Sequence, residues 1–286
     1  MTRALENNNK SLSALYKTWG WAAAHPVLAV CGYIVVVSVF FLVFPKVDLW
    51  ASGLFYVEGK GFVAKDVPIL REFRHLGPYL IKIAAIVSVA IMLLKLLLPA
   101  RSPLVPLRTP VFLVSTLILG PGILVNAILK DNWGRPRPNS VEVFGGTAHY
   151  QDVWVMSDQC ASNCSFVSGE ASGSMWLVAL AFVAPLAWRA AILWFVLPLG
   201  FLLSLNRIAF GGHFLSDTLL SWGLTLLVLL FVHRLLYRTG ARAIDDTRLD
   251  VWFTKAGRGL QRWTGRAAAA ASRAAIRFKN RFSKAS

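Results

Sequence analysis

Three short polar segments of this chain hold the groups that phosphoryl transfer through a histidine requires. They are Lys130–Pro138, Ser168–Glu170 and Arg207–Asp217, and each lies beside an apolar run. Together they supply fixed cations, a hydroxyl, and a histidine four residues ahead of an aspartate. Such chemistry depends mainly on positioning a nucleophile and on stabilising the charge of the phosphoryl oxygens.

The third segment contains the pair best suited to catalysis, His213 and Asp217. If a helix starts here, the two side chains share a face, and the carboxylate can accept a hydrogen bond from one ring nitrogen. That bond would fix the tautomer and leave the other nitrogen free to attack. A lone histidine at a membrane boundary is usually structural, but Arg207 six residues earlier favours function. Gly211 and Gly212 allow a tight turn before it.

The first segment contributes Lys130, Arg135 and Arg137, with Pro136 and Pro138 fixing the backbone around them. Basic residues at a span end are ordinarily topology anchors, an explanation that fits poorly on the outer face of the membrane. A guanidinium can hold two phosphate oxygens, and a lysine adds a point charge. We therefore predict a phosphate-binding role for this segment.

The second segment, Ser168 and Gly169 followed by Glu170, precedes another apolar run. A hydroxyl and free N–H groups at a helix start form an anion site. The simpler alternative is an N-cap followed by small packing residues. Glu170 would also be a favourable partner for the positive end of the helix.

The elements that position these segments are apolar. The chain has 286 residues, of which 56% are hydrophobic and 15% charged, which is too apolar for an ordinary soluble domain. We predict an all-α, polytopic membrane helix bundle with six transmembrane helices. The predicted spans are Trp21–Phe44, Leu76–Leu98, Pro110–Leu129, Ser174–Trp188, Ile192–Phe210 and Phe214–Leu236.

The flanking Lys and Arg residues predict the orientation of these spans. They place the N-terminus (residues 1–20), two of the links, including the one that carries Arg189, and the tail (239–286) in the cytoplasm. The polar segments of the six-span domain (21–238) then face the other side, although the first outer loop, 45–75, is also fairly basic. We expect an integral protein of a bacterial inner membrane with its site facing the periplasm.

The net charge of +16 would suggest nucleic acid as a partner of a soluble protein. Here more than half of the excess lies in the tail, which holds twelve Lys and Arg against three Asp from Arg238 onward. Apolar side chains recur at mostly three- and four-residue steps over residues 251–282. This pattern predicts a helix lying on anionic lipid headgroups, the alternative being a disordered basic tail. We expect no nucleic-acid partner, and the oligomeric state is left open.

Cysteine usage is sparse. Cys160 and Cys164 lie in the outer loop and could form a disulfide in an oxidising compartment. Cys31 falls inside the first span and is interpreted as packing. A metal site is less favoured, because only His149 is nearby as a further soft ligand.

The three segments resemble the motifs of the type 2 phosphatidic acid phosphatase (PAP2) superfamily, integral-membrane lipid phosphate phosphatases. The family pattern is Lys-x6-Arg-Pro, then Pro-Ser-Gly-His, then Ser-Arg-x5-His-x3-Asp. Lys130–Pro138 fits the first element, and Arg207–Asp217 fits the third with Asn206 in place of its serine. The middle element reads Val167–Glu170. With the order and the six-span layout, the resemblance covers about residues 20–238.

The resemblance implies a two-step phosphoryl transfer that uses no metal or cofactor. By it, His213 is the nucleophile that forms a phosphohistidine, and Asp217 orients it. Arg135 lies outside the pattern and is the weaker candidate. The groups expected to hold the phosphoryl oxygens are Lys130, Arg137, Ser168, the Gly169 N–H and Arg207.

Glu170 departs from the family, which has at this position a histidine that protonates the leaving group. A protonated carboxyl could do the same. His149, in the same outer loop, could supply the proton instead. A third interpretation is a subgroup that acts on a good leaving group, such as a diphosphate or a sugar phosphate.

The resulting hypothesis is a phosphatase acting on a membrane lipid phosphate at the outer leaflet. In a Gram-negative cell lipid A is the first substrate to try, followed by polyprenyl diphosphate, phosphatidylglycerol phosphate and phosphatidic acid. A phosphotransferase using the same phosphohistidine is an alternative. A non-catalytic lipid-binding or transport protein on the same scaffold is another, and Glu170 is the feature that supports it.

Overall fold

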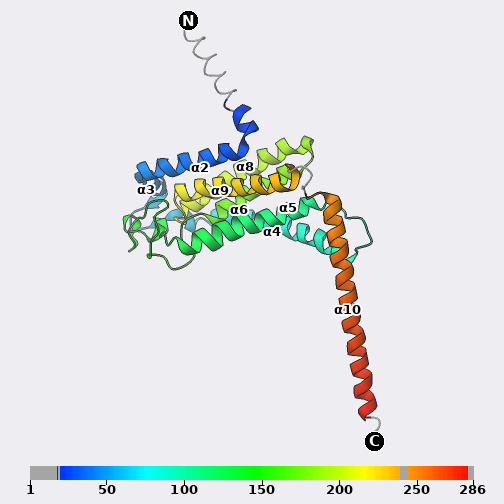
Figure 1. Ribbon diagram of the computed structural model, residues 1–286. Coiled ribbons are helices and arrows are strands. Elements are labelled where there is room, and N and C mark those ends of the chain that lie inside the picture. The colour runs from blue at the N-terminus through cyan, green and yellow to red at the C-terminus, as the bar shows by residue number, and fades with distance from the viewer. Residues whose placement is uncertain (1–17, 19, 239–243, 283–286) are drawn as a thin grey trace. The chain divides into compact units, whose positions relative to one another are not determined.

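The computed structural model describes residue 18, residues 20–238 and residues 244–282. The expected N-terminal region therefore lies almost wholly outside the described residues, as do both ends of the tail. The described chain is mostly helical and divides into two compact units (Figure 1). The first comprises Met1–Ile83 with Ser115–Arg234, and the second Ala84–Val114 with Leu235–Ser286.

The first unit begins with α2, whose start is set by a proline in its first turn. Helices α4 and α5 are divided between the two units. A small antiparallel hairpin is the only paired sheet among the described residues. In chain order the elements are α2 (Pro26–Val43), α3 (Lys46–Gly53), β1 (Tyr56–Val57), β2 (Gly61–Phe62), η1 (Val63–Asp66), α4 (Pro68–Leu97), α5 (Arg108–Leu117), η2 (Ile118–Lys130), η3 (Pro138–Ser140), η4 (Glu142–Phe144), α6 (Gly169–Trp176), α7 (Ala179–Val183), α8 (Leu186–Ala209) and α9 (Leu215–His233).

Within the described ranges, five helices are long and apolar enough to cross a membrane. They are Pro26–Val43, Pro68–Leu97, Arg108–Lys130, Leu186–Ala209 and Leu215–Tyr237. The third joins α5 to η2, which continues it with the wider π-helical hydrogen bonding, and the fifth joins α9 to η5 (Arg234–Arg238).

The remaining predicted span, Ser174–Trp188, has different bounds in the structure. The apolar stretch has the same length but lies five residues earlier, at Gly169–Val183 in place of Ser174–Trp188, and it consists of α6 and α7. Pro185 ends it, because the residue before a proline is driven out of helical conformation, and Ala184 is extended at φ −71° and ψ 152°. The next helix starts directly afterwards, so Arg189 lies in the first turn of α8 and not in a link.

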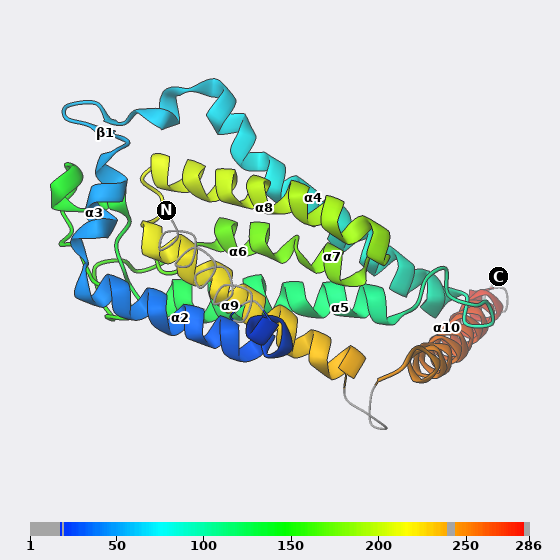
Figure 2. The same cartoon turned by 90° about the horizontal axis from the view of Figure 1, so that it is seen from above.

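Helix α6 is enclosed by protein. It packs against η2, α8 and α9, and Figure 2 shows α6 and α7 running alongside α8. Its buried hydroxyl groups find partners on the neighbouring helices, with Ser172 Oγ 2.6 Å from Thr225 Oγ1. Small residues and interhelical hydrogen bonds are what bring membrane helices close together. The buried sides of α6 thus face other helices.

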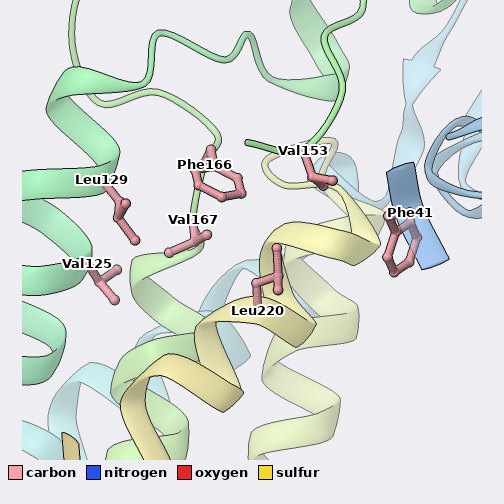
Figure 3. Packing of buried hydrophobic residues seen from close by; sticks show 7 residues of the cluster. All are labelled: Phe41, Val125, Leu129, Val153, Phe166, Val167 and Leu220. Carbon is pink, nitrogen blue, oxygen red and sulfur yellow. The ribbon is translucent and has the colours of Figure 1, made fainter. Parts of the chain in front are cut away.

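A hydrophobic cluster holds the segment ahead of α6 in place. Phe166 and Val167 of this segment pack with side chains of η2 and α9 (Figure 3). Each such side chain contributes about 1.5–3 kcal/mol when it is fully buried. Because these two residues lie between Ser165 and Ser168, the cluster fixes both serines. Its buried members are Phe41, Val125, Leu129, Val153, Phe166, Val167 and Leu220.

The second unit joins the end of α4 and the start of α5 to helix α10 (Asp246–Phe282). Arg108 Nε lies 2.7 Å from Asp246 Oδ2, and Lys95 Nζ lies 2.7 Å from Asp250 Oδ1. Residues 251–282 are helical, as their periodicity predicts. The position of this helix on a membrane surface stays a prediction, as does the three-part division at residues 20 and 238.

Candidate active site

His213 lies in the turn between α8 and α9 and is buried, with 1% of its surface exposed. Gly211 makes this turn possible with a φ of +60°, a conformation that favours glycine. Nδ1 of His213 lies 2.7 Å from the carbonyl oxygen of Ser165. A carbonyl oxygen only accepts, so Nδ1 carries the proton and donates. In the neutral ring, Nε2 then has a free lone pair.

The charge around His213 favours this neutral form. Burial lowers its pKa well below the ordinary value of 6.5, and Arg207, Arg137 and Lys130 lower it further. The bond to Ser165 opposes these effects without overcoming them. The three cations come from α8, the outer loop and the end of η2. The structure therefore brings the three predicted phosphate-binding cations together around the predicted nucleophile.

Asp217 is placed differently from the expectation. Its carboxylate accepts hydrogen bonds from Arg135, from the hydroxyl of Ser165 and, at 2.9 Å, from the backbone N–H of Phe214. The expected direct bond from His213 is replaced by the carbonyl of Ser165. The physical reason is that α9 starts only at Leu215, so the two residues are not one helical turn apart on a common face. Ser165 connects them, through its carbonyl and its hydroxyl.

Arg135 is the residue that the sequence pattern undervalued. It is fully buried, with Nη2 2.9 Å from Asp48 Oδ2 and Nη1 on Asp217. Its guanidinium also lies 4.5 Å from the centre of the Phe214 ring. Burial lowers its pKa, but Asp217 and Asp48 outweigh this and raise it, so Arg135 stays charged. We call Arg135, Asp48 and Asp217 the buried triad. Asp48, an acid among the apolar residues Val47, Leu49 and Trp50, was the available signal.

Ser168 and Gly169 start α6. The hydroxyl of Ser168 accepts from the N–H of Ala171 at 3.3 Å, so it acts as the N-cap. Its own N–H donates to the carbonyl of Asp217 at 3.3 Å. A side chain at Gly169 would place its Cβ 2.8 Å from Oδ1 of Asn126, so the side chain of Asn126 would have to move to accept it. The predicted contact of both residues with phosphate remains a prediction.

Glu170 bridges two arginines. Its Oε2 lies 3.1 Å from Nε of Arg207, and its Oε1 lies 3.4 Å from Nη2 of Arg74 on α4. Arg207 passes close over the backbone of Gly212, where a Cβ would lie 2.4 Å from Nη2. Arg74 was not anticipated, because its position in α4 resembled an ordinary charged span end. We call the two arginines with Glu170 the arginine bridge.

Arg137 is held by the outer loop. Its Nε and Nη2 donate to the carbonyl oxygen of Asn163 at 3.0 and 2.7 Å. Asn163 lies inside the short loop closed by a disulfide between Cys160 and Cys164. The disulfide thus sits directly beside a residue that positions one of the three cations.

His149 lies apart from these groups. Its ring is exposed, with Nδ1 2.9 Å from Oε2 of Glu142, and its backbone N–H donates to Gln159. Within the part of the chain that the structure describes, these are its polar partners, and none is a residue of the site. The same described part contains no cluster of three or more His, Cys, Asp or Glu residues arranged for a metal ion.

Comparison with known proteins agrees with this geometry. A family model described as the PAP2 superfamily matches residues 110–241. The chain is 33% identical over 205 residues to a lipid A 4′-phosphatase of Rhizobium leguminosarum, covering 66% of this chain and 86% of that protein. It is 34% identical over 203 residues to a lipid A 4′-phosphatase of Francisella tularensis subsp. novicida, covering 70% and 90%.

A solved structure, a PAP2-type phosphatidylglycerolphosphate phosphatase from Bacillus subtilis, aligns at 17% identity with a TM-score of 0.47, over 72% of this chain and 93% of that one.

A neutral histidine among cations, at the ends of apolar helices, defines a membrane-bound phosphatase. The family match and the two relatives identify which kind. The chain belongs to the PAP2 superfamily and is a PAP2-type lipid phosphatase.

Proposed function

We propose that this protein removes a phosphate group from lipid A through a phosphohistidine formed on His213. The observation that carries the proposal is the bond from Nδ1 of His213 to the carbonyl of Ser165. This bond leaves Nε2 unprotonated, with Lys130, Arg137 and Arg207 nearby. An unprotonated ring nitrogen is what a nucleophilic histidine requires.

In the first step, Nε2 of His213 forms a bond to phosphorus while the bond from phosphorus to the ester oxygen breaks. Lys130, Arg137 and Arg207 stabilise the negative charge that spreads over the phosphoryl oxygens. In the second step, water attacks the phosphorus, its proton passes to the carboxylate of Glu170, the bond from phosphorus to Nε2 breaks, and inorganic phosphate is released. Neither step uses a metal ion. Ser168 and the N–H of Gly169 contribute further donors at the start of α6.

The proton for the leaving oxygen is assigned to Glu170. It lies beside Arg207, whereas His149 is exposed and paired with Glu142 on the outer loop. Substrate phosphate competes with Glu170 for the arginines, and a carboxylate so displaced can carry a proton to the leaving group. The family's histidine would perform the same step from the same helical position.

Lipid A is proposed as the substrate because both relatives reported above are lipid A 4′-phosphatases. The site is proposed to face the periplasm of a Gram-negative inner membrane. The disulfide between Cys160 and Cys164 supports that side, since disulfides persist in oxidising compartments. Polyprenyl diphosphate is the second substrate to test.

Helix α10 is proposed to lie on anionic lipid headgroups. The basic side chains of Lys255, Arg258 and Arg262 line one surface depression with Gln261. Trp263 on the same helix is exposed, as expected of a residue that sits at a lipid interface. Sedimentation with anionic and neutral vesicles, before and after removal of residues 251–286, tests this contribution.

The decisive experiment is phosphate release by the purified protein in detergent with a chelator present. Lipid A, polyprenyl diphosphate, phosphatidylglycerol phosphate and phosphatidic acid are compared, beside His213→Ala and the matched control His149→Ala. We expect chelator-resistant release from lipid A, its loss in His213→Ala, and its retention in His149→Ala. Release that survives His213→Ala would exclude the phosphohistidine. Transfer to another lipid in place of water would identify a phosphotransferase.

A further inference from the structure

The site holds more positive charge than one phosphate group requires. Lys130, Arg137 and Arg207 surround His213 and lower its pKa. Two further cations lie near these groups: Arg74 on α4, whose Nη2 is 3.4 Å from Oε1 of Glu170, and Lys65 on η1, whose charge interacts with those of Arg207 and Arg137. Neither falls in a motif of the family pattern described above.

Arg74 is linked to Arg207 through the carboxylate of Glu170, which lies between the two guanidinium groups. The sequence of contacts runs from Nε of Arg207 to Oε2 of Glu170 at 3.1 Å, and from Oε1 to Nη2 of Arg74 at 3.4 Å. The side chain of Arg207 is 6% exposed and that of Arg74 is 37% exposed. Arg74 is therefore the member of the arginine bridge that a ligand from solution can reach.

Lys65 shares this part of the cluster. Burial lowers its pKa, Arg207 and Arg137 lower it further, and Asp66 opposes them. Arg74 likewise lowers the pKa of Arg137, after burial and against Glu170. These positive charges repel one another, and Glu170 is the acid that lies between two of them, Arg74 and Arg207. A phosphate monoester carries at most about two negative charges, so a single phosphate leaves this repulsion partly uncompensated.

We propose that Arg74, supported by Lys65, binds a second anionic group of the substrate next to the phosphoryl group at His213. Glu170 holds Arg74 and Arg207 in place until that substrate arrives. The ligand class is a diphosphate, or a lipid with a second phosphate beside the scissile one. The inference rests on the proposed phosphatase function, which places the transferred phosphate at His213.

The test uses binding, so that it does not depend on turnover. In the full-length His213→Ala protein, binding of farnesyl diphosphate is compared with that of farnesyl phosphate, which has the same chain and one phosphoryl group fewer. Adding Arg74→Ala should weaken diphosphate binding about tenfold, as expected for a lost charged hydrogen bond. Monophosphate binding should stay within about twofold, because the three inner cations remain. Adding Lys65→Ala should weaken diphosphate binding less.

Arg71→Ala is the matched control, since Arg71 is an exposed arginine one turn earlier on α4. It should leave both affinities unchanged. Arg74→Lys keeps the charge and should retain most of the diphosphate preference, which separates binding from misfolding. An equal loss for both ligands, or no loss for either, would overturn the proposal. Failure of the proposed function would appear separately, as absence of phosphate release by the unmutated protein.

Discussion

Two ionic clusters lie within this fold, and they are built in opposite ways. The buried triad sets one cation between two carboxylates, all fully buried, and Arg135 donates further hydrogen bonds to the hydroxyls of Ser216 and Tyr150. The arginine bridge sets one carboxylate between two cations and is open at Arg74. The first cluster is satisfied and closed. In the arginine bridge, two guanidinium groups share one carboxylate, so N–H donors are left over for the anionic group that we propose it binds.

The same residue types thus hold the fold together in the buried triad and are proposed to bind substrate in the arginine bridge. A buried charge must be fully paired, because an unpaired one costs several kcal/mol. A cation at a binding site must instead exchange its internal partner for the ligand. The four predictions below test this division, from the largest expected effect to the smallest.

Arg135→Ala should give the largest loss, and that loss should be one of folding. It leaves Asp48 and Asp217 buried without their cation, a defect that costs about 3–5 kcal/mol. Thermal unfolding in detergent, followed by circular dichroism, measures it. A well-folded Arg135→Ala protein that has lost only activity would show that the buried triad belongs to the chemistry and would break the comparison.

Arg137→Ala should do the opposite and remove activity while sparing the fold. Its guanidinium is partly exposed and bonds only to the carbonyl of Asn163 among described residues. Loss of one charge-stabilising donor lowers kcat by about 100- to 1,000-fold. Arg137→Lys keeps the positive charge but lacks the two-pronged guanidinium, so its kcat should fall between those of Arg137→Ala and the unmutated protein. A large drop in unfolding temperature in either variant would count against the division.

The pH dependence should report the cations around His213. Burial and these cations lower the pKa of His213 below its ordinary 6.5, and the neutral ring is the nucleophile. As pH falls, kcat/KM should therefore stay level through 6.5 and decline only below it, where the ring takes up a proton. Lys130→Met removes one of the cations, so its acid limb should move to higher pH. An acid limb of the unmutated protein's kcat/KM profile centred above pH 6.5 would contradict a lowered pKa of His213.

Opening the disulfide should have the smallest effect. Cys164→Ser loosens the loop whose Asn163 carbonyl holds Arg137. A hydrogen bond from a charged group contributes about 1.5–3 kcal/mol, and a loosened loop loses only part of it, so we expect a loss of about tenfold or less in kcat/KM. Reductant should reproduce this loss in the unmutated protein and add nothing to Cys164→Ser. Cys31→Ser is the control, since Cys31 is a free thiol elsewhere.

The sequence was sufficient for the features that depend on composition and local spacing. Apolar runs predicted the long helices, and the motifs predicted which cations gather around His213. The predicted bond between His213 and Asp217 was wrong, because four-residue spacing implies contact only where both residues lie in one helix. The turn at Gly211 and Gly212 places His213 before that helix begins.

Long-range pairs could not be predicted. Arg135 and Asp48 are 87 residues apart, and Arg74 and Glu170 are 96 apart. Spacing says nothing about such contacts, which depend on how α3 and α4 pack. The fourth apolar run was predicted as the short span Ser174–Trp188, and its helical bounds, which begin at Gly169, depend on packing in the same way. A helix lined by protein needs neither the length nor the hydrophobicity of one lined by lipid.

That enclosed helix has a consequence for where the reaction takes place. The start of α6 carries Ser168, Gly169 and Glu170, and most of its surface touches η2, α8 and α9. A bilayer that thickens or thins acts on helices through their contact with acyl chains. Since α6 is largely shielded from those chains, we expect the depth of Ser168, Gly169 and Glu170 to be set by the neighbouring helices. The position of this part of the site in the membrane therefore depends on contacts within the protein and not on the thickness of the surrounding lipid.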